Sequence, residues 1–298
     1  MSEAGVPVDV LETPSPRVSE LRRITRVMFS RWVVTGGAVI ILVLILVAIF
    51  APLLAPYDPD KLDLANALSQ PSKVYLLGTD ELGRDILSRV IYGSRISLLV
   101  GIVAVTVAGI VGMVLGLIAG YFRGWTNIII MRCIDSLLAL PPLVLILAIA
   151  AVLGGGLLNI LIAIAIGMMP VYCRLMCGQV LTIKESDFVT AAYVIGASDL
   201  RIMFRHLLPN SLPPLLILIT VNLGVAILME AALSFIGIGI NPPTATWGSM
   251  VASGYKYLLT NSIISFAPGV AILLVVLAFN MVGDGLRDAL DPRLRGII

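Results

Sequence analysis

Charged residues are scarce in this chain. Only 13% of its 298 residues are charged, whereas soluble domains carry about a quarter. With 59% hydrophobic residues, the chain lacks the polar surface that a soluble domain needs. The same composition excludes intrinsic disorder except at the two ends of the chain. The net charge of +2, without a separate basic stripe, argues against a nucleic-acid partner. The composition therefore indicates an integral membrane protein.

Cysteine and histidine are also scarce, which excludes a disulfide framework and argues against a metal centre. Cys133, Cys173 and Cys177 lie in or beside apolar runs. Cys173 and Cys177 share one helix face, but His206 is the sole histidine and no carboxylate joins the pair. We therefore interpret all three cysteines as small core residues rather than metal ligands.

Motifs for catalysis are absent from the sequence. It contains no G-x-x-x-x-G-K-[ST] nucleotide-binding loop, no H-E-x-x-H and no G-x-S-x-G. The chain is therefore predicted to be non-catalytic and to bind no cofactor of its own. If it performs energy-driven work, another polypeptide must supply the energy.

Long uncharged runs are what the sequence does contain. A bilayer needs about 20 mostly apolar residues per helix, and continuous runs without period-two alternation indicate helices rather than a barrel. One uncharged run, 136–173, is too long for a single span and contains a Gly-Gly-Gly turn at 154–156. The predicted fold is all-α with six transmembrane helices, at about 33–55, 96–121, 128–152, 157–178, 213–240 and 263–283.

The distribution of lysine and arginine predicts the orientation. With the N-terminus in the cytoplasm, 14 of these residues fall inside and 6 outside, which places both termini in the cytoplasm. The first span is then expected to be a signal anchor. The predicted organisation is a cytoplasmic tail with a basic helix (1–31), a membrane domain (32–295), outer segments 58–95 and 241–262, and a cytoplasmic loop 182–210.

The cytoplasmic loop 182–210 has the pattern of two short helices. Residues 188–194 suit a helix that Gly196 ends, and residues 197–206 suit a second helix. Three positions carry almost no side chain, so another protein could approach closely: Ala191, Ala192 and Gly196. A protruding docking knob and an ordinary interhelical loop are both consistent with this pattern.

Several features inside the predicted spans concern packing or a polar path. Asp135 lies three residues after Arg132, a spacing that allows a pair on one helix face. Glu230 has no basic neighbour one turn away, so it is expected to face the interior, either lining a path or bonding a neighbouring helix. Small residues every four positions form a seam that packs within the chain or against a partner: Ala104, Ala108, Gly112, Gly116 and Gly120.

At this point the sequence resembles the permeases of ABC importers. Their cytoplasmic loop carries a Glu-Ala-Ala triplet, three residues, a glycine, nine residues, a hydrophobic position, one residue and Leu-Pro. The corresponding positions here are Thr190-Ala191-Ala192, Gly196, His206 and Leu208-Pro209. The spacing matches, while Thr190 replaces the glutamate and His206 replaces the hydrophobic residue.

Four further segments narrow the resemblance to the C-type permease subunit of the dipeptide, oligopeptide and nickel importers. Segment 78–101 is similar to that family's outer-loop signature, and segments 129–145, 233–250 and 277–295 match in order. The signature residues in the first segment are Gly78, Thr79, Asp80, Gly83, Arg84 and Asp85. The resemblance covers about residues 20–295.

The resemblance implies a type I ABC importer permease in a bacterial cytoplasmic membrane. The implied partners are a B-type permease, two cytoplasmic ATPases that bind ATP and magnesium, and an extracytoplasmic binding protein that delivers a peptide. The implied ATPase-coupling residues are Thr190, Ala191, Ala192, Gly196, Leu208 and Pro209. Glu230 and Asn222 are candidates for lining the peptide's path, which the two permeases would form together.

Other functions remain open at this stage. Within the same family, the solute could be a nickel chelate or another small molecule. From another class, a stand-alone secondary transporter would need coupling-ion sites and usually internal repeats, and we see no repeat. An intramembrane enzyme would need a catalytic constellation, and we find none.

Overall fold

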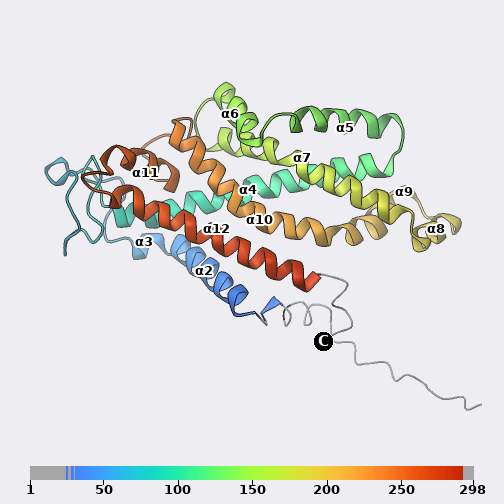
Figure 1. The fold of residues 1–298 in the computed structure, drawn as a ribbon, viewed down its shortest axis with the longest axis horizontal. Helices are drawn as coiled ribbons and strands as arrows, with labels where there is room; N and C mark the ends of the chain where they lie inside the picture. The colour runs from blue at the N-terminus through green and yellow to red at the C-terminus, as the bar shows by residue number, and fades with distance from the viewer. Residues whose placement is uncertain (1–24, 26–27, 30, 291–298) are drawn as a thin grey trace, which may run out of the picture.

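A computed structural model describes residues 25, 28–29 and 31–290. The predicted basic helix of the N-terminal tail lies largely outside these residues. The described residues contain no β-strand and form an elongated helical bundle (Figure 1). Its long helices are α2 (Trp32–Ile49), α4 (Ile86–Tyr121), α7 (Leu157–Lys184), α10 (Leu208–Ile236) and α12 (Ile263–Leu290), together with the shorter α5 (Trp125–Leu138) and α6 (Pro142–Leu153).

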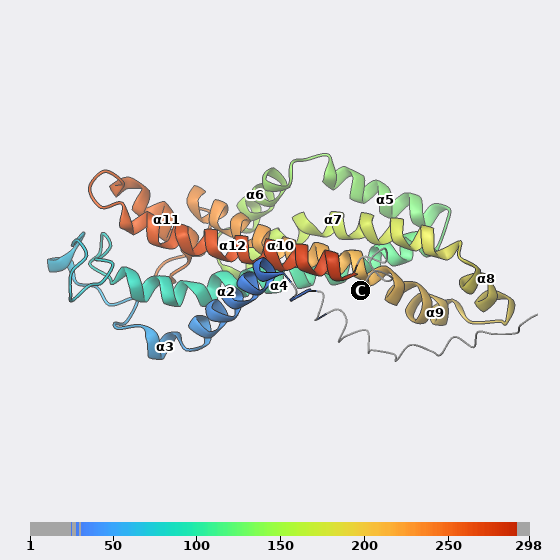
Figure 2. The ribbon, with the colours of Figure 1, turned by 60° about the horizontal axis from the view of Figure 1, so that its bottom comes forward.

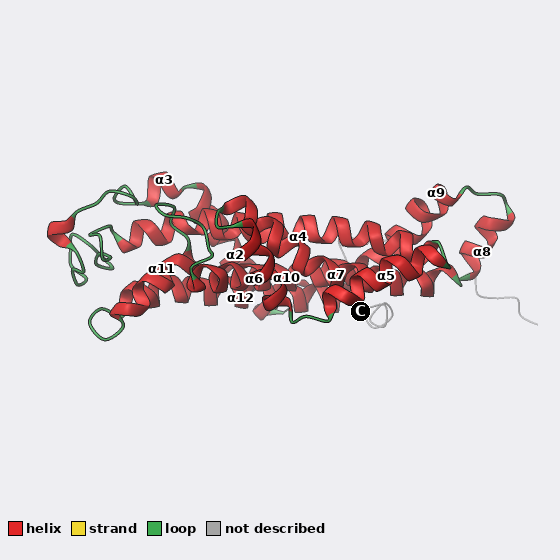
Figure 3. Cartoon of the chain, turned by 90° about the horizontal axis from the view of Figure 1, so that it is seen from above, coloured by secondary structure: helices red, strands yellow, loops and turns green. Residues whose placement is uncertain are grey.

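Short elements occupy the two ends of the bundle. One end carries α3 (Ala51–Leu54), the 3₁₀ turn η1 (Leu64–Asn66), α11 (Trp247–Gly254) and the 3₁₀ turn η3 (Tyr255–Tyr257). The opposite end carries α8 (Asp187–Val194), α9 (Asp199–Ile202) and the π-helical turn η2 (Met203–Leu207), which leads directly into α10. Figure 3 shows the outer loop with α11 and the α8–α9 pair at opposite ends of the molecule.

Five described helices are long and apolar enough to cross a membrane, and the α5–α6 pair makes a sixth span if it is counted as one. In place of a continuous helix over 128–152, α5 and α6 meet at an angle of 91°. Pro141 and Pro142 explain the break, because proline cannot donate a helical hydrogen bond and disfavours helix in the residue before it. Helix α4 starts ten residues before the expected 96 because the Asp85 side chain caps it.

The helices form layers, with α5 and α6 along one side, α2 and α12 along the other, and α4, α7 and α10 between them (Figures 1 and 2). The small-residue seam of α4 packs against α7 within this chain. A Cβ atom on Gly112 would lie 2.7 Å from the Met169 carbonyl oxygen, and Gly116 and Gly120 meet α7 in the same way. Small residues here let the two helix backbones approach closely. Cys173 and Cys177 are buried in this seam, whereas Cys133 is exposed on α5.

Candidate functional site

The loop 182–210 forms a knob at one end of the bundle. Ser186 is the N-cap residue of α8, and Gly196 follows the helix with φ +77°, a conformation that favours glycine. The Ala197 amide donates to the Ala192 carbonyl and the Gly196 amide to the Tyr193 carbonyl. These two bonds make a Schellman motif. The second helix starts at Asp199 rather than at 197 and continues through η2.

Apolar side chains are exposed on this knob to an extent that is unusual for a surface meant to face water. Val194 and Ile195 are each 82% exposed. The other large exposed apolar residues are Phe188, Tyr193, Leu200 and Phe204. A hollow of about 230 Å³ lies among Phe188, Ala191, Ala192, Ile195, Ala197, Arg201 and His206. Exposed apolar patches of this kind mark interaction surfaces.

The predicted coupling residues fall into two groups on this knob. Thr190, Ala191 and Gly196 are exposed, whereas Ala192 is buried. Leu208 and Pro209 form the first turn of α10, where a proline needs no helical donor. The triplet and the Leu-Pro pair are therefore parts of one compact unit. Each has an exposed member, Ala191 in the triplet and Pro209 in the pair, whereas Ala192 is buried and Leu208 is half-buried.

A hydrogen-bonded group that the sequence analysis missed attaches the knob to the bundle. The Tyr121 hydroxyl, at the end of α4, donates to Asp199 Oδ1 at 2.5 Å and accepts from the Tyr193 hydroxyl at 2.9 Å. Lys184 Nζ donates to the Tyr121 carbonyl at 2.7 Å and lies 4.6 Å from the ring centroid. Tyr121 therefore connects α4, the end of α7, α8 and α9. Its partners are 63 to 78 residues distant in sequence, so no local signal could have identified them.

At the opposite end, the outer-loop signature residues form a buried polar core. Asp80 Oδ1 accepts the amides of Leu82 and Arg84, and its Oδ2 pairs with Arg84 Nε at 2.7 Å. Arg89 Nε lies 3.6 Å from the same carboxylate, and its Nη1 donates to the Pro59 carbonyl. This network holds the loop 58–85 against the start of α4.

The remaining signature residues shape the loop backbone. Asp85 Oδ2 accepts from the amide and the hydroxyl of Ser88, which caps α4. Gly78 and Gly83 have φ values of +79° and +74°. A side chain on Gly83 would collide with the backbone of Asp63. The signature residues therefore fix the backbone of the loop 58–85. We call this loop, together with the start of α4, the outer platform.

Outer segments distant in sequence are joined beside this platform. Tyr257 donates a hydrogen bond to Glu81 Oε2 at 3.1 Å, and this bond raises the pKa of Tyr257. The Asn66 side chain donates to Asp63, which lowers the pKa of that carboxyl. The two outer segments thus form one surface.

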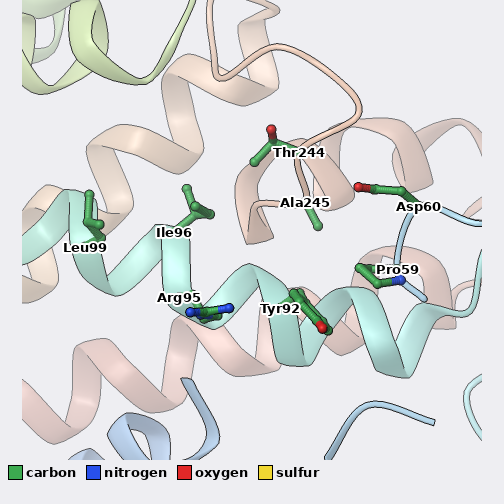
Figure 4. A pocket seen from close by; sticks show the side chains of 8 residues that line it. All are labelled: Pro59, Asp60, Tyr92, Arg95, Ile96, Leu99, Thr244 and Ala245. Atoms are coloured by element: carbon green, nitrogen blue, oxygen red, sulfur yellow. The ribbon is translucent and has the colours of Figure 1, made fainter. Parts of the chain in front are cut away.

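A pocket of about 300 Å³ opens next to the platform (Figure 4). Tyr92 and Arg95 extend from α4, Asp60 comes from the outer loop, and Thr244 comes from the segment before α11. Arg95 is exposed and forms no ion pair with any residue that the structure describes. The pocket thus combines a cation, a carboxylate and an aromatic hydroxyl at the outer end.

The two predicted path residues do not lie on an open surface. Glu230 is fully buried, and its Oε1 accepts from the Ser234 hydroxyl at 2.8 Å. Asn222 is half-buried and donates to the Tyr172 hydroxyl at 2.9 Å, which ties α10 to α7. Both side chains therefore bond within this chain, and their place in a path stays a prediction.

The ion pair that Asp135 forms is not the one that the sequence spacing allowed. Asp135 pairs with Arg174 of α7 rather than with Arg132 of its own helix. At the opposite edge of the bundle, Arg31 Nη1 lies 2.7 Å from Asp288 Oδ2 and holds the start of α2 against α12. Among the described residues, no group of three or more His, Cys, Asp or Glu side chains is placed to hold a metal ion.

Two models of known protein families match parts of this chain. Residues 112–296 match the model described as binding-protein-dependent transport system inner membrane component. Residues 19–71 match the N-terminal TM domain of oligopeptide transport permease C.

Curated relatives match along most of the chain. A probable D,D-dipeptide transport system permease protein of Escherichia coli K12 is 45% identical over 271 residues, covering 89% of this chain and 91% of that protein. A di/tripeptide transport system permease protein of Pseudomonas aeruginosa is 47% identical, covering 87% and 88%. A glutathione transport system permease protein of Escherichia coli O6:K15:H31 is 44% identical, covering 87% and 86%.

Among solved structures, an inward-facing form of the MetNI methionine ABC transporter has a similar fold. The TM-score is 0.56 at 18% identity, and the match covers 69% of this chain and 98% of that one. The bundle thus has the fold of type I ABC importer permeases.

Proposed function

Because the chain belongs to the family of binding-protein-dependent transport system inner membrane components, we propose that it is the C-type permease subunit of an ATP-driven importer of dipeptides or short oligopeptides. The observation that carries this proposal is identity of 45% and 47%, over nearly nine-tenths of the chain, to permeases named for D,D-dipeptide and di/tripeptide transport. Glutathione, which a third relative is named for, is itself a short peptide.

The α8–α9 knob supports a mechanical role in this importer. It lies at one end of the bundle, with Val194 and Ile195 exposed on a compact, internally bonded unit. A cytoplasmic ATPase that covers this surface would move the knob as it closes around ATP and magnesium, while this chain binds neither. Since η2 continues into α10 and Tyr121 joins the knob to α4, the movement would reach two long helices.

The opposite end of the bundle suits a different partner. The rigid platform around Asp80 and the pocket at Arg95 would face the extracytoplasmic binding protein and the peptide that it releases. A B-type permease would complete the path. With the knob in the cytoplasm, both chain termini would lie on that side.

The test is purification of the tagged chain from its native membrane in mild detergent, followed by mass spectrometry and reconstitution into liposomes. We expect a second permease and two ATPases to copurify, and ATP with the associated binding protein to drive uptake of a labelled dipeptide. Uptake of a nickel chelate instead of the dipeptide would show that the importer carries a metal chelate and not a peptide. Solute movement by the isolated chain without ATP would contradict the importer assignment and support a secondary transporter.

A further inference from the structure

The ion pair between Asp135 and Arg174 is partly open to the surroundings. It joins α5 to α7, and its two side chains are 45% and 54% exposed. The contact uses Asp135 Oδ1 and one terminal nitrogen of Arg174. No residue within the described part of the chain donates a hydrogen bond to Asp135 Oδ2, so part of each charged group is available to a ligand.

The depth of this pair follows from the α4–α7 seam. Cys173 packs between the levels of Gly112 and Gly116, so Arg174 lies near residue 114 of α4. The run 96–122 of α4 carries no charge, and residue 114 lies eight residues from its inner end. At about 1.5 Å per residue this is about 12 Å inside the run. A hydrocarbon core of about 30 Å centred on this run would therefore contain the pair.

The face of α7 that carries Arg174 continues as an exposed stripe of mixed residues to the end of the helix. Gly178, Leu181 and Thr182 are exposed on it, and Glu185, the C-cap residue, pairs with Arg123. The exposed face of α2, by contrast, is apolar, with Val39 and Leu42 more than half exposed. Because charges in lipid are costly and usually face a protein interior or a water-filled cavity, the α7 stripe does not face lipid.

We propose that this stripe lines the inner half of the translocation path and that Asp135 and Arg174 form a binding subsite for the two charged ends of the solute. When the path holds no solute, Asp135 and Arg174 pair with each other. A peptide presents an ammonium group to Asp135 and a carboxylate to Arg174, so the charges exchange partners at little electrostatic cost. The assignment of Asp135 and Arg174 to the charged ends of a peptide rests on the proposed peptide import. The proposal that the α7 stripe faces a water-filled path, which we call the aqueous face, does not.

The aqueous face is tested by the reactivity of an introduced thiol in the complete importer. Gly178→Cys is suitable because a Cβ there has no neighbour within 4 Å, and Cys133→Ala removes the exposed native thiol. A charged methanethiosulfonate reagent should modify Cys at 178 about ten-fold faster than Cys at 42 in Leu42→Cys, because the reactive thiolate forms only where water reaches it. Equal slow rates would overturn the proposal and place the stripe against lipid or the partner permease.

The subsite is tested by neutralising both charges at once, with Asp135→Asn and Arg174→Gln in one chain. Uptake of the labelled dipeptide should fall about ten-fold, the loss expected for one charged hydrogen bond, while the complex assembles and ATP hydrolysis persists. Arg132→Gln is the matched control, because this exposed arginine on the same helix forms no ion pair with a described residue and should transport normally.

The outcomes separate the two proposals. Wild-type uptake by the double variant, or its failure to assemble, would overturn the subsite and make the pair a structural tie. A wild-type complex that takes up no peptide, yet shows fast modification at position 178, would contradict peptide import and leave the aqueous face standing.

Discussion

At the scale of single residues, Glu230 is a carboxyl that is fully buried within this chain. Its carboxyl lies where α10 meets α11, and a Cβ on Gly248 would lie only 2.5 Å from Cα of Ala231. The Ser234 hydroxyl donates to Oε1, whereas Oε2 has no hydrogen-bond partner among the described residues. These contacts favour the interior-facing role expected from the sequence, with the carboxyl directed at its own chain.

Replacing this carboxyl by an amide tests its role in transport. Glu230→Gln replaces a carboxylate oxygen by an NH₂ group in a fully buried site, and a buried donor that is left without an acceptor costs about 1–3 kcal/mol. We expect lower peptide uptake with unchanged ATPase binding, because the knob lies at the other end of the bundle. Uptake in liposomes and ATPase copurification measure the two effects. Ser234→Ala, which keeps the carboxyl, should be milder, and loss of complex assembly in Glu230→Gln would assign the residue to helix packing.

At the scale of elements, the knob depends on the turn at Gly196. This residue has positive φ, and its position is open, since a Cβ there would have no neighbour within 4 Å. A substitution therefore strains the backbone by about 1–2 kcal/mol without causing a clash inside the chain. Any larger effect must come from contact with a partner.

Gly196→Arg is expected to uncouple ATP hydrolysis from peptide uptake while the protein still inserts in the membrane. The bulky side chain would prevent the close approach of an ATPase to Ala191 and the exposed surface around it. Gly196→Asn is the control, because asparagine tolerates the left-handed conformation and adds little bulk. The ratio of peptide transported to ATP hydrolysed is the measurement. Normal peptide uptake by the arginine variant at normal expression would contradict the docking of an ATPase on the knob.

The elements also show which features could be predicted from the sequence. Helix α8, expected over 188–194, spans Asp187–Val194, and Gly196 ends it, because both signals are local in the chain. The pair between Asp135 and Arg132 that the spacing allowed is not formed, and Asp135 pairs with Arg174. The i,i+3 rule considers only its own helix, whereas packing brings in Arg174, 39 residues away. The bend at Pro141 had a local signal, which the length of the apolar run obscured.

At the scale of the whole molecule, α4 runs from the outer platform to the knob. Its 36 residues extend about 54 Å at the usual helical rise. Its first turn is capped by Asp85 within the outer platform, and its last residue is Tyr121 at the knob. The small residues of the α4–α7 seam pack these two helices closely against each other, and we expect them to move together. A displacement of the knob would therefore reach the pocket at Arg95 through α4.

Tyr121→Phe tests this connection with the loss of one hydroxyl group. The ring stays in place, but the bonds to Asp199 and Tyr193 are lost, at about 1 kcal/mol each. We expect ATP hydrolysis by the assembled importer to continue while peptide uptake per ATP falls, because the knob then moves without carrying α4. Tyr193→Phe removes only the second bond and should have a smaller effect. An unchanged uptake per ATP in Tyr121→Phe would show that α10, which continues directly from η2, transmits the movement by itself.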